Sequence, residues 1–208
     1  MKLKLFTILT IALINLCYAQ VPENQELSRT LDSIYEEDQK YRKQISSVMK
    51  EHGQNSEEFQ ELAMTMIKTD ASNLLVIEQI LDDYGWLGAD VVGNKGNQTF
   101  FLVIQHADLQ TQQKYLPMME VAVEKGNAKS QNFALLKDRV LIGEGKKQIY
   151  GSQLGVNQET GKYFIEPIKD PKHVNKRRQK MGLGPIEDYV SRFGIKWDVQ
   201  KHIENTEK

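Results

Sequence analysis

Apolar side chains recur at helical spacing through most of this chain. The first stripe predicts a long amphipathic helix in an N-terminal region of residues 20–55, with Gly53 at its end and only Asp38 interrupting it. Its apolar members are Leu27, Leu31, Ile34, Tyr41, Ile45 and Val48. Ser56 and Asp70 are residue types that cap helix N-termini, so each is expected to start a further helix.

The middle of the chain combines a glycine-rich stretch with more helical patterns. Residues 85–97 contain four glycines and predict a turn-rich connection. The apolar run from Thr99 to Ile104 predicts a buried helix. Asp108 and Ser130 are expected to cap the two helices that follow.

The pattern changes to alternation in the C-terminal third. Residues 148–153 and 163–166 alternate polar and apolar side chains around a loop rich in Gly, Asn and Thr, which predicts a β-hairpin. Prolines at 171 and 185 predict two short helices after it. The fold class is therefore mainly α, with about six or seven helices in one domain and a small β-hairpin. Residues 56–200 would hold the helical domain with its hairpin, and residues 201–208 a flexible tail.

The first 19 residues predict a secretory signal peptide. Lys2 and Lys4 precede an apolar run, and Ala19 offers a cleavage site. Cleavage there would remove Cys17, the one cysteine of the chain, so an exported mature protein would fold without disulfides. A retained membrane anchor and lipidation of Cys17 are the alternatives, and bulky Leu16 disfavours lipidation. We expect an exported protein, periplasmic or extracellular, with no stable membrane insertion after cleavage.

Composition narrows the function classes. Of the 208 residues, 40% are hydrophobic and 26% charged, as in a folded globular protein, and the formal charge of −1 gives no sign of nucleic-acid binding. The histidines, His52, His106, His173 and His202, lack ligand spacing, so no metal and no cofactor is predicted. The basic stretch 172–180 is expected to be a solvated helix face, with anion contact as the alternative.

Six short motifs follow one another between Leu74 and Tyr189. They are Tyr84-Gly85-Trp86, Gln105-His106-Ala107-Asp108, Leu136-Lys137-Asp138-Arg139, Gln148-Ile149-Tyr150-Gly151-Ser152-Gln153, Pro167-Ile168-Lys169-Asp170, and Arg177-Arg178 through Gly182-Leu183. The series resembles an uncharacterised bacterial family, a domain of unknown function with Gly-Trp, Gln-His-Ala-Asp, Asp-Arg and Gln-x-Tyr-Gly-[Thr/Ser]-Gln signatures. Leu87 stands where that family usually has proline. The resemblance implies no activity, because the family has none assigned.

His106 and Asp108 are the candidate catalytic residues. His106 lies between an apolar run and an acid, and an imidazole titrates near pH ~6.5, which suits proton transfer. A histidine at the end of a buried segment can equally just hydrogen-bond a carbonyl. Asp108 is expected to cap a helix, and a cap can also face a ligand where the turn forms the wall of a cleft.

The other candidates are polar groups expected to hold a substrate. Asp138 and Arg139 lie in an apolar helix, where an unpaired charge is costly, so each needs a partner. Arg139 would bind a substrate anion or, alternatively, take part in a structural ion pair or bind a carbonyl. In the hairpin, Gln148 and Tyr150 would share one strand face, and Gln153 would lie on the other.

These residues suggest a hydrolase acting on a polar extracytoplasmic substrate. His106 would be its general acid or base, Arg139 would hold an anionic group, and Gln148, Tyr150 and Gln153 would orient the substrate. The alternative is a non-catalytic binding or interaction module, with a small polar ligand or a protein as partner, in which the same residues form a structural network.

Overall fold

A computed structural model describes residues 24–206 of the chain. The helices are α1 (Gln25–Arg42), α2 (Ile45–His52), α3 (Glu57–Tyr84), α4 (Ala89–His106), α5 (Leu109–Glu124), α6 (Ser130–Gly143), α7 (Val174–Lys180), α8 (Ile186–Ser191) and α9 (Val199–Thr206). Strands β1 (Leu154–Val156) and β2 (Tyr163–Ile165) form an antiparallel hairpin, and a 3-10 helix, η1 (Pro171–His173), precedes α7. The predicted fold class, mainly α with a small hairpin in the C-terminal third, is confirmed. The predicted signal peptide lies outside the described residues.

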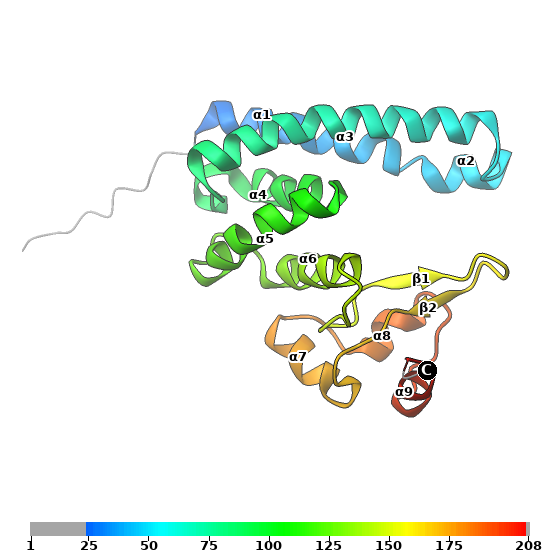
Figure 1. Cartoon of the computed structure of the whole chain (residues 1–208). Helices are drawn as coiled ribbons and strands as arrows, with labels where there is room; N and C mark the ends of the chain where they lie inside the picture. Colours follow the sequence, from blue (N-terminus) through cyan, green and yellow to red (C-terminus); the bar gives the residue numbers. More distant parts are fainter. Residues whose placement is uncertain (1–23, 207–208) are drawn as a thin grey trace, which may run out of the picture.

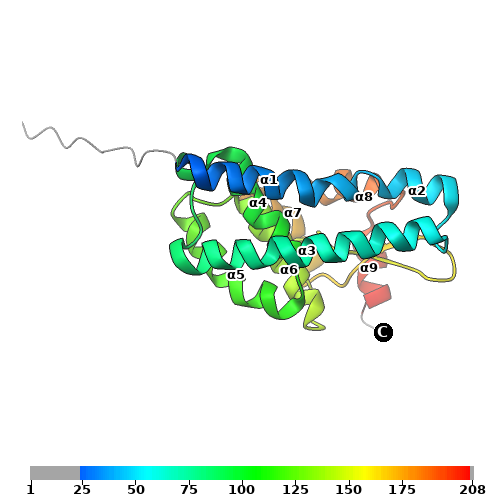
Figure 2. The same ribbon diagram turned by 90° about the horizontal axis from the view of Figure 1, so that it is seen from above.

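The helices form layers (Figures 1 and 2). Helices α1 and α3 lie side by side and cover α4 and α5, and α6 leads into the C-terminal part with the hairpin and α7 to α9. The main hydrophobic core lies among α1 and α3 to α6 and includes the fully buried Phe100, Leu136 and Met119. A smaller core lies below the hairpin and is made by Ile168, Val174, Ile186 and Val190. Among residues 24–206, no helix is long and apolar enough to cross a membrane.

The N-terminal stripe forms two helices rather than the single long helix predicted. The regular hydrogen-bond ladder of α1 ends where the Gln44 amide donates to the Tyr41 carbonyl at 3.0 Å, three residues back instead of four. The chain then restarts as α2. Conversely, α3 runs through Asp70 without a break. Asp70 therefore lies inside a helix instead of capping one, and its carboxylate is bound by Arg42 of α1.

The glycine-rich stretch is more helical than predicted. Helix α4 begins at Ala89, and the turn-rich connection is confined to the residues before it. Gly93 has a φ of 73° and kinks the helix there. Gly96 is buried, and a Cβ at this position would meet the Leu31 side chain at 3.2 Å, so a residue without a side chain lets α1 approach α4. The predicted buried helix at Thr99 to Ile104 is confirmed as part of α4.

The C-terminal third differs in detail from the prediction. Strand β2 lies where expected, but its partner is β1 and not residues 148–153, of which only Gln148 makes a bridge, to Ile168. The residues between bend because their amides donate to Asp138, as described below. Residues 201–206 of the predicted tail belong to α9, in which His202 is buried. Helix α6 is preceded by Lys129, and Ser130 donates to the Met181 carbonyl instead of capping.

Candidate functional site

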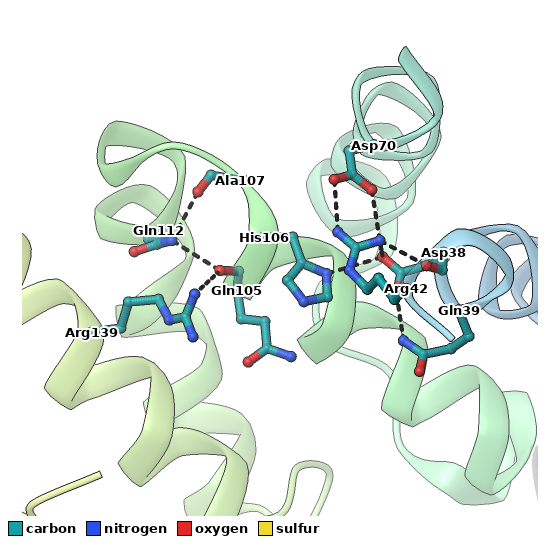
Figure 3. A network of polar contacts seen from close by, with 9 residues as sticks. All are labelled: Asp38, Gln39, Arg42, Asp70, Gln105, His106, Ala107, Gln112 and Arg139. Atoms are coloured by element: carbon teal, nitrogen blue, oxygen red, sulfur yellow. Dashed lines mark hydrogen bonds and ion pairs between the residues drawn. The ribbon is translucent and has the colours of Figure 1, made fainter. Parts of the chain in front are cut away.

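His106 is the last residue of α4, and its ring is bound by a carboxylate from α1. Its Nδ1 lies 3.1 Å from Oδ1 of Asp38 (Figure 3). The imidazole side chain is 20% exposed, whereas that of Asp38 is 1% exposed. An ionised carboxylate at this distance accepts the Nδ1 proton, which leaves Nε2 as the basic nitrogen of the neutral ring. Nε2 has no hydrogen-bond partner within residues 24–206.

The Asp38 carboxylate is itself fixed by neighbouring side chains. The Gln39 amide donates to it at 2.6 Å, and the Arg42 guanidinium lies 3.2 Å away. Arg42 also donates two hydrogen bonds to Asp70 of α3, at 3.0 and 2.7 Å (Figure 3). Burial by itself would raise the pKa of Asp38, but the hydrogen bond and charge of His106, with the contributions of Gln39 and Arg42, outweigh it and lower that pKa. Asp38 is therefore an ionised, immobile partner for the imidazole.

A cavity of about 380 Å³ opens beside this pair of side chains. We call it the His106 cavity, and its lining residues are Asp38, Ile67, Asp70, Ala71, Leu74, Val103, His106, Ala107 and Asp108. The lining thus combines aliphatic side chains with three carboxylates and an imidazole. Its lining contains no Ser, Thr, Cys, Tyr or Lys side chain, so a hydroxyl, thiol or amine nucleophile would have to come from solvent or substrate.

Asp108 lies at the edge of the His106 cavity and caps α5. Its Oδ1 accepts the Thr111 amide at 2.8 Å, which confirms the predicted N-cap. Hydrogen bonds from Thr111, chiefly from its amide, lower the pKa of Asp108. The side chain is exposed, so the ionised carboxylate both caps the helix and faces solvent beside His106.

Arg139 lies on the other side of the α4 terminus. Its guanidinium donates to the Gln105 carbonyl at 3.1 Å, and Gln112 donates to the same carbonyl and to that of Ala107 (Figure 3). These side chains satisfy carbonyls that the end of a helix leaves unpaired. Arg139 makes no ion pair among the described residues, and burial lowers its pKa. Of the roles open to Arg139, carbonyl binding is the contact observed.

Asp138, the neighbour of Arg139, is fully buried and bound by four hydrogen-bond donors from one short segment. The amides of Ile149, Tyr150 and Ser152 donate to it at 2.7 to 3.1 Å, and the Ser152 hydroxyl donates at 2.9 Å. Because Asp138 belongs to α6 of the main core and the segment leads to the smaller core, this carboxylate joins the two.

The hairpin-side candidates take part in the same structural network. Gln148 is fully buried, donates to the carbonyls of Gln153 and Glu166, and accepts the Gln153 amide. The Gln153 side chain donates to the Leu135 carbonyl of α6 and to the Ser152 hydroxyl. The Tyr150 ring is partly buried, and burial, together with the charge of Asp138, raises its pKa.

The sequence candidates therefore fall into two places. His106 and Asp108 line one cavity, whereas Arg139, Gln148, Tyr150 and Gln153 do not line it.

The sequence prediction missed Asp38, Arg42 and Asp70. A signal for Asp38 was present, because it is the one charged residue that interrupts the apolar stripe of the N-terminal region. Within the described chain, no group of three or more His, Cys, Asp or Glu side chains could hold a metal ion.

Comparison with known proteins gives a family and no activity. Neither the curated proteins nor the solved structures contain a match. A family of unknown function, DUF6624, matches residues 25–199, a longer stretch than the one that carries the sequence motifs. Since this match covers most of the chain, the protein belongs to the DUF6624 family of unknown function.

Proposed function

We propose that this protein is an exported hydrolase in which His106, oriented by Asp38, activates a water molecule. The observation that carries the proposal is the 3.1 Å contact between His106 Nδ1 and the buried Asp38 carboxylate beside a cavity. Export rests on the leader-like residues 1–19 alone.

The reaction follows from the groups that line the His106 cavity. Nε2 of His106 takes a proton from water while the water oxygen forms a bond to the electrophilic carbon of the substrate. The imidazolium then gives this proton to the leaving group as its bond to that carbon breaks. Asp38 stabilises the imidazolium and keeps the ring in the correct tautomer. Asp108 would accept a hydrogen bond from a substrate hydroxyl or amine, and the aliphatic lining residues would pack against the apolar part of the substrate.

A binding module without catalysis is the second candidate. It is favoured by the contacts of Gln148 and Asp138, because the polar atoms of both side chains are hydrogen-bonded to partners inside the protein. It is also favoured because no hydroxyl, thiol or amine side chain lines the His106 cavity. In this case the cavity would bind a small polar ligand and release it unchanged.

The first experiment measures the protonation of His106 without any substrate. Long-range 1H–15N NMR spectra at neutral pH should show a proton on Nδ1 and a bare Nε2, and the Asp38→Asn variant should lose this preference. A proton on Nε2 in the wild-type protein would remove the proposed general base.

The second experiment looks for turnover with chromogenic esters, amides and glycosides. His106→Gln should lower any hydrolysis found by about a hundredfold or more, which is the range of a general base. Its melting temperature should stay close to that of the wild type, because the glutamine amide can still donate to the Asp38 carboxylate. Lys114→Gln, on the solvent face of α5, serves as the control variant and should keep full activity. Saturable binding of a probe without turnover would favour the binding module.

A further inference from the structure

A second cavity lies between β2 and α9, in the C-terminal part of the molecule. Its volume is about 610 Å³, within the range of small-molecule sites. We call it the C-terminal cavity. Its lining residues are Tyr163, Phe164, Ile165, Glu166, Pro167, Gly194, Ile195, Lys196, Trp197, Asp198, Lys201, His202, Asn205 and Thr206. None of them lines the His106 cavity.

Three aromatic side chains line the C-terminal cavity, and neighbours fix two of them. Tyr163 and Phe164 are 47% and 45% exposed. The Tyr163 ring makes an edge contact with Phe193, with centroids 5.2 Å apart, and Trp197 packs against His202 at 5.3 Å. His202 is held in turn, since its Nε2 accepts the Ile168 amide at 3.2 Å. Fixed, partly exposed rings can stack on a ligand at little cost in conformational entropy.

Polar side chains with free hydrogen-bonding groups surround these rings. Among the described residues, the side chains of Glu166, Lys196, Lys201 and Asn205 have no hydrogen bond or ion pair. Asp198 has one carboxylate oxygen engaged, as an acceptor for the Lys201 amide. Donors and acceptors are both present, and the charges of the two lysines balance those of Glu166 and Asp198.

We propose that the C-terminal cavity binds a neutral saccharide. A sugar ring has apolar C–H faces that pack on aromatic rings, and hydroxyl groups that need both donors and acceptors at its edge. The lining offers this combination. A strongly anionic or cationic ligand is disfavoured, because the lining carries no net excess of either charge. This site is separate from the proposed catalytic pair and would hold the protein on a glycan-bearing surface or polymer.

The test is binding of maltotetraose, cellotetraose and chitotetraose to the full mature chain. The chain has two tryptophans, and Trp86 is buried in the main core, so a saturable change in tryptophan fluorescence would report on Trp197. Calorimetry should show that Trp197→Ala weakens the binding of the active sugar by about tenfold and Asn205→Ala by about fivefold.

Two control variants test whether the sugar binds in the C-terminal cavity itself. Gln200→Ala, on α9 but outside the lining, should bind like the wild type, and so should His106→Gln, which alters the other cavity. Because Asn205 is exposed and without a partner among the described residues, its variant remains informative if the Trp197 variant fails to fold. The proposal is overturned if none of the three sugars binds saturably at millimolar concentration, or if both variants bind them normally. It is also overturned if glucose 6-phosphate binds more tightly than the neutral sugars do.

Discussion

Asp38 and His106 are separated by 68 residues in the sequence, and their side chains lie 3.1 Å apart. The contact depends on the packing of α1 along α4, which places the buried Asp38 carboxylate next to His106, the last residue of α4. The contact affects both the chemistry of the imidazole and the stability of the protein in acid.

Asp38→Asn should destabilise the protein at pH 7 and lose this effect in acid. The folded state lowers the pKa of Asp38 below 3.8, so the ionised carboxylate stabilises the fold above that pH and ceases to do so as the pH falls through the folded pKa. We expect a loss of about 1–3 kcal/mol at pH 7 in urea titrations. An equal difference between the two proteins at pH 7 and at pH 2 would contradict this role of the carboxylate.

Asp108→Ala should destabilise the protein, because it removes the hydrogen bond to the Thr111 amide at the start of α5. Asp108→Asn should restore most of that loss, since asparagine also caps helices well. Thermal unfolding of the three proteins measures both effects. If Asn and Ala destabilise equally, the charge of Asp108 rather than its capping bond matters.

Asp138→Asn should destabilise the protein by about 3 kcal/mol or more. All four groups that bind this buried carboxylate are donors, and an amide nitrogen in place of one oxygen would face them with hydrogens of its own. Lys137→Ala is the matched control on the same helix and should change stability little. Denaturant midpoints give the comparison, and a near-wild-type midpoint for Asp138→Asn would show that this network does not join the two cores.

Gly151→Ala should be more costly than Gly145→Ala, although both glycines have a positive φ, of 68° and 70°. A Cβ at 151 would lie 2.6 Å from Ile186 and 2.9 Å from Ile168, whereas one at 145 would meet nothing within 4 Å. We expect about 1 kcal/mol for Gly145→Ala from backbone strain, and about 2 kcal/mol more for Gly151→Ala from crowding of the smaller core. Equal losses of unfolding free energy for the two variants would mean that the smaller core accommodates the added Cβ at no cost.

His202 should make the fold less stable in mild acid. Burial, with a smaller effect from Lys147, lowers the pKa of His202 below 6.5, so the unfolded chain takes up a proton before the folded one does. Stability should therefore be full above pH 6.5 and decrease as the pH falls from there toward the folded pKa. Protonation would also remove the lone pair that accepts the Ile168 amide.

The matched variant for this effect is His202→Gln, which keeps an acceptor and cannot titrate. Its stability should vary less than that of the wild type between pH 7 and pH 5 when both are followed by urea unfolding. Parallel curves for the two proteins would place the pH dependence elsewhere.

The sequence by itself determined the features that depend on neighbours within a few residues. Helical spacing identified the buried segment of α4, and capping chemistry identified Ser56 and Asp108 as helix starts. Alternation placed β2 but also predicted a strand at residues 148–153, where backbone amides donate to Asp138 instead of to a neighbouring strand. The spacing of residues 148–153 cannot reveal this, because their hydrogen-bond acceptor lies on α6.

Tertiary structure alone decided which polar groups meet. Asp70, expected to cap a helix, lies within α3 and binds Arg42, and Arg139 binds a helix-terminal carbonyl. Such contacts join residues that are distant in the chain, and their geometry is fixed by how apolar helix faces pack. Hydrophobic burial is non-directional, so a sequence pattern indicates that a face is buried without indicating which helix will cover it.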